Sequence, residues 1–212
     1  MRTSALWFIL ALASALLVQA HGASAHPHVW VTAKAEIVYE KGQIAAIQHH
    51  WTFDEFYTAQ AIEGLDKNGD GIYSREELAE LAQVNMQGLK EFEYFTYATR
   101  GKERVAMAEP VDPWLEHKAG LLTLHFRLPL AKPLPGDVKG FSLAVYDPSF
   151  FIAFEMAKDA PFALVGAPAG CKITFGAAVE TETSEQSNGS VFGSPATKAG
   201  YVTCGPGHEG PK

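Results

Sequence analysis

Short apolar segments separated by turn residues fill the second half of the chain, and this pattern limits the possible folds more than any other feature. Gly, Pro, Asp and Lys residues separate the segments at residues 100–102, 132–137 and 147–149. The segments are EFEYFTYATR, KERVAMAEPV, LLTLHFRLPL, GFSLAVYD, FFIAFEMA and CKITF. Frequent short strands joined by turns are typical of an antiparallel β-sandwich.

A β-hairpin is predicted ahead of these segments, over residues 29–53. β-Branched and aromatic residues are common along both of its arms, and the turn at residues 40–43 contains Gly42. A glycine-containing turn between two such runs is the usual sign of a hairpin. The first two strands are therefore expected to be neighbours in one sheet.

The sequence becomes helical in character after the hairpin. Thr52 and Glu55 fit a capping box, which predicts a helix that runs from there to about residue 65. A second helix is predicted at about residues 75–90, where apolar residues recur on one stripe. We therefore predict an α+β fold, a mostly antiparallel β-sandwich over residues 26–176 with an EF-hand helix–loop–helix inserted at about residues 54–90.

The loop between the two predicted helices, DKNGDGIYSREE, matches the calcium loop of an EF-hand at every ligand position. Such a loop has oxygen ligands at positions 1, 3, 5, 7, 9 and 12 and a glycine at position 6, here Gly71. The predicted Ca²⁺ ligands are Asp66, Asn68, Asp70, the Ile72 carbonyl, Ser74 and Glu77. The alternative is a solvated turn between helices. A single loop of this kind in an exported protein indicates a structural clasp rather than a sensor.

Residues 1–25 predict an exported protein. Arg2 gives a short positive start, and the apolar run LWFILALASALLV is too short to span a bilayer. ASA at residues 23–25 has the small-x-small pattern of a signal peptidase site, and cleavage there leaves His26 as the first residue. VQA at residues 18–20 is a second candidate site. The segment is therefore predicted to be a signal peptide.

The chain has two cysteines, Cys171 and Cys204. An even number of cysteines in an oxidising compartment predicts a disulfide between them, and a pair of reactive thiols is the alternative. Residues 177–212 are polar and low in large apolar groups. They are expected to form a flexible C-terminal segment that the disulfide tethers.

Charge and missing motifs exclude some classes of function. The 17 Lys and Arg residues stand against 24 Asp and Glu, a formal net charge of −7 at pH 7. No basic run is interleaved with aromatic residues, so nucleic acid is not an expected partner. The sequence has no GxSxG stretch, no HExxH and no phosphate-binding loop, and no enzyme is predicted.

Histidines gather near the predicted new N-terminus and in the second arm of the hairpin. His26 and His28 face the same side of an extended strand, because side chains alternate along it. One of His49 and His50 must share that face, and the other must point away. Imidazole nitrogens and the terminal amine suit Zn²⁺, Cu²⁺, Ni²⁺ or Co²⁺. His125 shows no partner spacing and is expected to be an ordinary sheet histidine.

Several motifs, taken in this order, resemble the domain-of-unknown-function family DUF1007, also catalogued as an uncharacterised periplasmic component of ABC-type transport. They are HPHVW at residues 26–30, WTFDE at residues 51–55, the single calcium loop, YDP at residues 146–148 and the late Cys171. The resemblance implies a periplasmic accessory protein that binds Zn²⁺, Ni²⁺ or Co²⁺. Its partner would be a nickel/cobalt-type, zinc or ABC-type membrane permease.

The resemblance also implies which residues bind the transition metal. The HPH motif maps to His26 and His28, and the family's histidine before the WTFD stretch maps to His49. Asp54 and Asp147 are further candidates, either as ligands or as carboxylates that orient the imidazoles. The alternative roles are helix capping for Asp54 and a turn for Asp147.

Two other functions remain open on the sequence alone. One is a copper redox protein with a histidine brace at His26, for which Trp30, Trp51 and Trp114 would form an aromatic platform for substrate. The other is an interaction module that is stabilised by calcium and has no role with transition metals.

Overall fold

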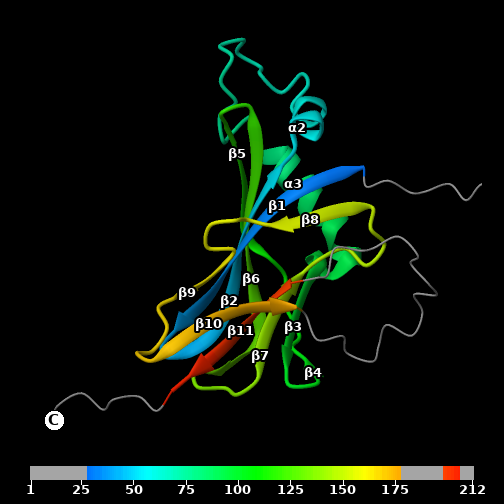
Figure 1. The fold of residues 1–212 in the computed structure, drawn as a ribbon. Coiled ribbons are helices and arrows are strands. Elements are labelled where there is room, and N and C mark those ends of the chain that lie inside the picture. Colours follow the sequence, from blue (N-terminus) through cyan, green and yellow to red (C-terminus); the bar gives the residue numbers. More distant parts are fainter. Residues whose placement is uncertain (1–27, 178–197, 206–212) are drawn as a thin grey trace, which may run out of the picture.

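The computed structural model describes residues 28–177 and 198–205, which form two β-sheets and an inserted pair of helices (Figure 1). The larger sheet contains β1 (Val29–Glu40), β2 (Gln43–Phe53), β5 (Val111–Lys118), β6 (Leu121–Pro135), β8 (Ile152–Met156) and β9 (Phe162–Val165). The smaller sheet contains β3 (Thr96–Arg100), β4 (Glu103–Arg104), β7 (Phe141–Val145), β10 (Cys171–Ala177) and β11 (Lys198–Cys204). The predicted signal peptide and His26 lie outside the described residues.

The predicted hairpin is confirmed as β1 and β2, which pair antiparallel around a turn at Lys41 and Gly42. Both turn residues have positive φ, 50° and 75°, a backbone conformation that glycine adopts without strain. The strand order of the larger sheet is β5-β6-β2-β1-β8, with β9 also beside β1. β2 is therefore an interior strand, and β5 lies at one edge.

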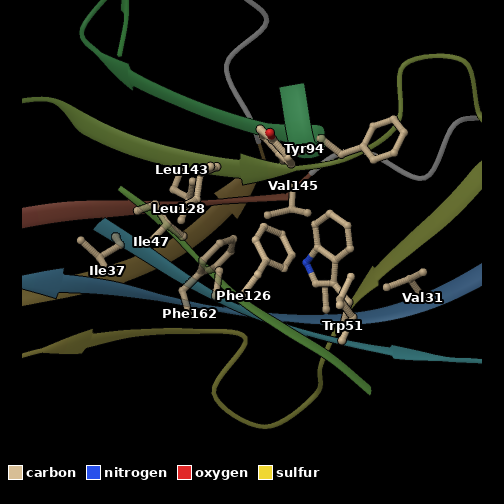
Figure 2. Close-up of a cluster of buried hydrophobic side chains, with 14 of the residues drawn as sticks. Val31, Ile37, Ile47, Trp51, Tyr94, Phe126, Leu128, Leu143, Val145 and Phe162 are labelled. Carbon is tan, nitrogen blue, oxygen red and sulfur yellow. The ribbon is translucent and has the colours of Figure 1, made fainter. Parts of the chain in front are cut away.

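One hydrophobic core joins the two sheets. Along β6, every second residue from Leu122 to Leu130 is buried, which is the alternation expected of a strand with one face in a core. Trp51 and Phe126 of the larger sheet converge on Val145 of the smaller one (Figure 2). The predicted α+β class, mostly strand with few helices, is confirmed.

The helical insertion follows β2, as predicted. It consists of α2 (Glu55–Ala61), α3 (Ala79–Leu89) and the 3₁₀ helix η2 (Lys90–Phe95). The capping residue was predicted wrongly, because Asp54 and not Thr52 caps α2. Thr52 still belongs to β2, where its hydroxyl lies 3.0 Å from that of Thr123 in β6.

Strand β11 corrects the prediction of a flexible segment for residues 177–212. Lys198–Cys204 pairs antiparallel with both β10 and β7, so it is an interior strand of the smaller sheet. Gly200 allows close packing of this strand, because a Cβ at that position would lie 2.8 Å from the Phe162 ring. Residues 178–197 and 206–212 lie outside the described residues.

The structure confirms the predicted disulfide between Cys171 and Cys204. The two residues face each other in the register of β10 and β11, so the bond joins two neighbouring strands. Within the described residues, no helix has both the length and the apolar character needed to cross a membrane.

Candidate metal centre

Strand alternation sends the two neighbouring histidines of β2 to opposite faces of the larger sheet. His49 is fully buried between the sheets, whereas His50 is partly exposed on the outer face. In the register of the hairpin, His49 lies opposite Ala35 and His50 opposite Lys34. The histidine chosen from the family resemblance, His49, is thus a core residue.

The hydrogen bonds of His49 fix its tautomer. The Thr96 hydroxyl donates its proton to the Tyr94 carbonyl oxygen at 2.7 Å, so it accepts a hydrogen bond from His49 Nε2–H at 3.1 Å. The other ring nitrogen, Nδ1, is a buried lone pair without a hydrogen-bond partner. The ring stacks on Phe126, with centroids 4.7 Å apart. Burial, and secondarily the charge of His50, lowers the pKa of His49 to about 3, so the ring is neutral.

On the outer face of the larger sheet, two imidazoles are in direct contact. His50 of β2 and His125 of β6 are cross-strand partners, and their Nδ1 atoms lie 2.6 Å apart. Two bare lone pairs or two N–H groups would repel at that distance, so the pair shares one proton. We call these two residues the histidine pair.

Carboxylates flank the histidine pair on both sides along the sheet. Glu36 of β1 lies 3.9 Å from His50 Nε2, and Glu116 of β5 lies 3.9 Å from His125 Nε2. The Trp114 ring stacks on His125 with a centroid separation of 4.0 Å. Burial, followed by the charge of His50, lowers the pKa of His125 to about 4, so this imidazole is neutral at pH 7 and its unprotonated nitrogen can bind a cation.

The structure does not bring His28 together with the histidines of β2. His28 precedes Lys34, the partner of His50, by six residues, which is about 20 Å at roughly 3.3 Å per strand residue. Its ring packs instead against Phe151, with centroids 4.8 Å apart. His26 lies outside the described residues.

Backbone N–H groups occupy the carboxylates of Asp54 and Asp147. Asp54 Oδ1 accepts a hydrogen bond from Tyr57 N at 2.9 Å, and Oδ2 accepts one from Trp30 N at 2.8 Å. Asp147 accepts hydrogen bonds from the backbone of Ser149 and of Ile152. Both residues therefore have the structural roles, helix cap and turn, that were their alternatives on the sequence.

The predicted calcium loop forms a compact turn between α2 and α3. Asp66 accepts hydrogen bonds from Gly69 N at 2.8 Å and Gly71 N at 2.9 Å, and both glycines have positive φ. Asp70 Oδ1 accepts one from Ile72 N at 2.7 Å. The side-chain oxygens of the loop thus turn inward, toward its own backbone.

Glu77 closes the end of this loop. Its two oxygens accept hydrogen bonds from Lys67 N and from Ser74, and these bonds, with that of the Ser74 backbone strongest, lower the pKa of the Glu77 carboxyl. The ionised carboxylate and its oxygen neighbours have the hard donor chemistry that Ca²⁺ prefers. Among residues 28–177 and 198–205, however, no group of three or more His, Cys, Asp or Glu side chains is arranged to hold a metal ion.

Sequence reasoning did not place His125, Trp114 or Glu116 at the candidate metal site. The alternation of apolar residues along β6 could have placed His125 on the outer face, because the even-numbered residues around it are buried. The pairing of β6 with β2 could not be read from the sequence, because residues 54–120 separate the two strands. The three tryptophans form no platform, because Trp51 is only 1% exposed.

Surface hollows lie elsewhere. One, of about 460 Å³, opens between Trp30, Asp54 and Phe56, and another, of about 520 Å³, lies beside Tyr94 and Glu109. Neither of these two hollows is lined by the histidine pair, which is only partly exposed on the outer face of the sheet.

The chain is similar to a family of unknown function and to two uncharacterized proteins. The family described as "Protein of unknown function (DUF1007)" matches residues 10–199. An uncharacterized protein of Haemophilus influenzae is 25% identical over 136 residues, which are 64% of this chain and 65% of that protein. An uncharacterized 15.5 kDa protein from the trpE 3′ region of Spirochaeta aurantia is 29% identical over 99 residues, 47% of this chain and 70% of that protein. The chain thus matches just under two thirds of the length of the Haemophilus protein.

Proposed function

The chain belongs to the DUF1007 family of proteins of unknown function, and from that premise we propose that it is an exported accessory protein that binds a transition metal and assists its transport by a membrane permease. The cargo is Zn²⁺, Ni²⁺ or Co²⁺. A calcium ion in the loop at residues 66–77 stabilises the protein. The proposal assigns no catalytic reaction to the chain.

The observation that carries this proposal is the 2.6 Å contact between the Nδ1 atoms of His50 and His125. A cation could take the place of the shared proton if that proton moves to Nε2 of its own ring, and both Nδ1 lone pairs would then be ligands on one sheet face. Imidazole nitrogen suits Zn²⁺, Ni²⁺ and Co²⁺ better than Ca²⁺ or Mg²⁺. Glu36 and Glu116 add negative charge on either side.

Partial exposure of the histidine pair fits a protein that passes its metal on. The His50 side chain is 30% exposed and the His125 side chain 12%. Two protein ligands leave coordination positions open, and a partner can fill those positions during transfer. A buried, fully coordinated structural site would instead hold its ion.

The proposals of export and of a permease partner do not depend on the histidine pair. The disulfide between Cys171 and Cys204 is compatible with an oxidising compartment. The apolar run and the ASA sequence at residues 23–25 support a signal peptide. The permease partner follows only from the family resemblance of the sequence motifs.

Calorimetric titration of the mature chain with Zn²⁺, Ni²⁺ and Co²⁺, at saturating Ca²⁺, tests the proposal. We expect one equivalent of binding that is lost in a His50→Ala/His125→Ala double variant. His117→Ala is the matched control, because His117 is a sheet histidine that packs on Tyr73, outside the pair. A His26→Ala/His28→Ala variant shows whether the histidines near the N-terminus contribute to the metal binding that is measured.

The results distinguish the candidate functions. Loss of binding in the terminal variant alone would move the metal site to the N-terminus and retain the accessory role. Absence of binding of all three metals to the intact chain would contradict the proposal. The interaction module stabilised by calcium would then be the better description.

A further inference from the structure

The calcium loop holds the edge strand β5 from both sides. Arg75, at loop position 10, places its guanidinium carbon 4.7 Å from the centroid of the Trp114 ring. Tyr73, at loop position 8, packs edge-on against His117 with centroids 4.8 Å apart. Trp114 and His117 are three residues apart in β5, so their side chains point to opposite faces of the sheet.

One of these two contacts leads directly to the histidine pair. The Trp114 ring lies nearly parallel to the His125 ring, with an interplanar angle of 12° and a centroid separation of 4.0 Å. His125 in turn contacts His50 through the two Nδ1 atoms. Arg75, Trp114, His125 and His50 therefore form one continuous chain of contacts from the loop to the outer face of the sheet.

We infer that the loop regulates the histidine pair, so that Ca²⁺ at residues 66–77 tightens the binding of a transition metal at His50 and His125 through Arg75 and Trp114. The inference rests on the proposed function, since it needs both cation sites. It adds a coupling between those sites that the proposed function does not require.

The position of Arg75 within the loop explains how the coupling would arise. Arg75 lies between Ser74 and Glu77, both predicted ligands, so a bound cation fixes the backbone on either side of it. Without a cation, the carboxylates of Asp66, Asp70 and Glu77 repel one another and loosen the loop. The Arg75 side chain then no longer orders the Trp114 ring.

An ordered Trp114 ring should favour metal binding at the histidine pair. A ring held flat on His125 restricts that imidazole before a cation arrives, so less conformational freedom is lost on binding. The positive charge of Arg75 acts in the opposite direction, toward weaker cation binding. Arg75 is exposed, however, and water and salt screen its charge. The net coupling is therefore expected to be positive, about three- to tenfold in affinity.

Zinc titration of the full mature chain, with and without saturating Ca²⁺, tests this inference. The chain is freed of metal on a chelating resin, and the zinc heat assigned to the pair is the heat lost in the His50→Ala/His125→Ala variant. We expect Ca²⁺ to lower the zinc dissociation constant about three- to tenfold. By reciprocity, zinc should lower the calcium dissociation constant by the same factor.

Two loop variants identify the route. Arg75→Met removes the guanidinium that lies over the Trp114 ring, and the effect of Ca²⁺ on zinc affinity should disappear. Lys67→Met is the matched control, because it removes the same charge from the same loop at a residue with no contact to Trp114 among the described ring contacts. The control should keep the full effect. Equal loss of the effect in both variants would contradict a route through Arg75.

Tryptophan fluorescence tests the same series of contacts, from Arg75 to His50, independently of zinc affinity. Addition of Ca²⁺ alone should change the emission of Trp114, and the change should be absent in Trp114→Phe and in Arg75→Met. Zinc binding of equal affinity with and without Ca²⁺ would overturn this inference and leave the proposed function intact. Absence of binding of zinc, nickel and cobalt under both conditions would overturn the proposed function itself.

Discussion

His49 is a histidine used as a core aromatic residue. Its ring stacks on Phe126 and meets the edge of Trp51, while Nε2 donates to Thr96. A second proton would place a charge at Nδ1, which has no partner in this part of the core. Burying an unpaired charge costs several kcal/mol, so the neutral ring is strongly preferred.

This preference predicts a loss of stability in acid. The pKa of His49 is about 3 in the folded protein and near 6.5 when unfolded, so the unfolded chain binds the extra proton between those values. The contribution of His49 to the free energy of unfolding should therefore be complete above pH 6.5 and fall by roughly 1.4 kcal/mol per pH unit as the pH drops toward 3. Urea unfolding of the metal-free chain at several pH values measures this slope.

A His49→Gln variant is the control for that measurement. The Gln amide can still donate to Thr96 but does not titrate, so the part of the slope due to His49 should be absent. His125, whose pKa is also lowered, contributes a separate slope above about pH 4 that both proteins share. Identical slopes in the two proteins would show that His49 is accessible to protons in the folded state.

Alternation predicted that His49 and His50 point to opposite faces, but it could not decide which one points inward. That choice depends on which face of the hairpin the smaller sheet covers, and the covering strands come from residues 96–204. The predicted convergence with His28 assumed a register in which residues 28 and 50 are neighbours. The observed register, His50 opposite Lys34, separates them.

Among the elements, helix α2 begins at a residue that also anchors β1. Asp54 caps the helix through Oδ1 and accepts the Trp30 N–H through Oδ2, so one side chain joins the end of β2 to the start of β1. Asp54→Ala should lower the free energy of unfolding by about 1–3 kcal/mol, from the lost cap and the lost strand bond. Asp54→Ser keeps a capping oxygen only, so its melting temperature should lie between those of Asp54→Ala and the wild type.

Predictability differed among the strands for physical reasons. β6 and β7 have clear apolar patterns and were predicted, while β5, VDPWLEHK, contains Pro113 and charged residues. Proline is tolerated there because β5 is an edge strand with a bulge between Val111 and Trp114. The parallel pairing of β1 with β8 and β9 also could not be read from sequence, since it joins segments far apart in the chain.

The disulfide links β10 to β11 and closes a loop that spans residues 171–204. A Cys171→Ser/Cys204→Ser variant should lose roughly 3–4 kcal/mol of stability in the chain-entropy account. Thermal melts should place the variant and the reduced wild type at the same lowered temperature. A wild type whose melting is unchanged by reductant would contradict this role.

On the scale of the whole molecule, the predicted calcium loop at residues 66–77 is attached to the common core and not only to its own helices. Leu78 follows the loop directly and is fully buried, and Ala82 and Met86 of α3 are buried in the same cluster as Trp51. Figure 1 shows the loop beyond the end of β5, at one end of the larger sheet. Order in the loop is therefore linked to the packing of α3 and so to global unfolding.

This attachment predicts a calcium-dependent melting temperature. With a dissociation constant of about 10⁻⁴–10⁻³ M, as is usual for extracellular modules, about 1 mM Ca²⁺ should add roughly 0.4–1.4 kcal/mol to the free energy of unfolding. For a chain of this size the melting temperature should rise by about 1–5 °C. Glu77→Gln, which weakens the bidentate position, should abolish the rise, whereas Glu76→Gln, one residue earlier and outside the ligand set, should keep it. Mg²⁺ at the same concentration should have a smaller effect, because it demands octahedral geometry. An equal rise in Glu77→Gln would mean that Ca²⁺ acts on the general acidic surface and not at the loop.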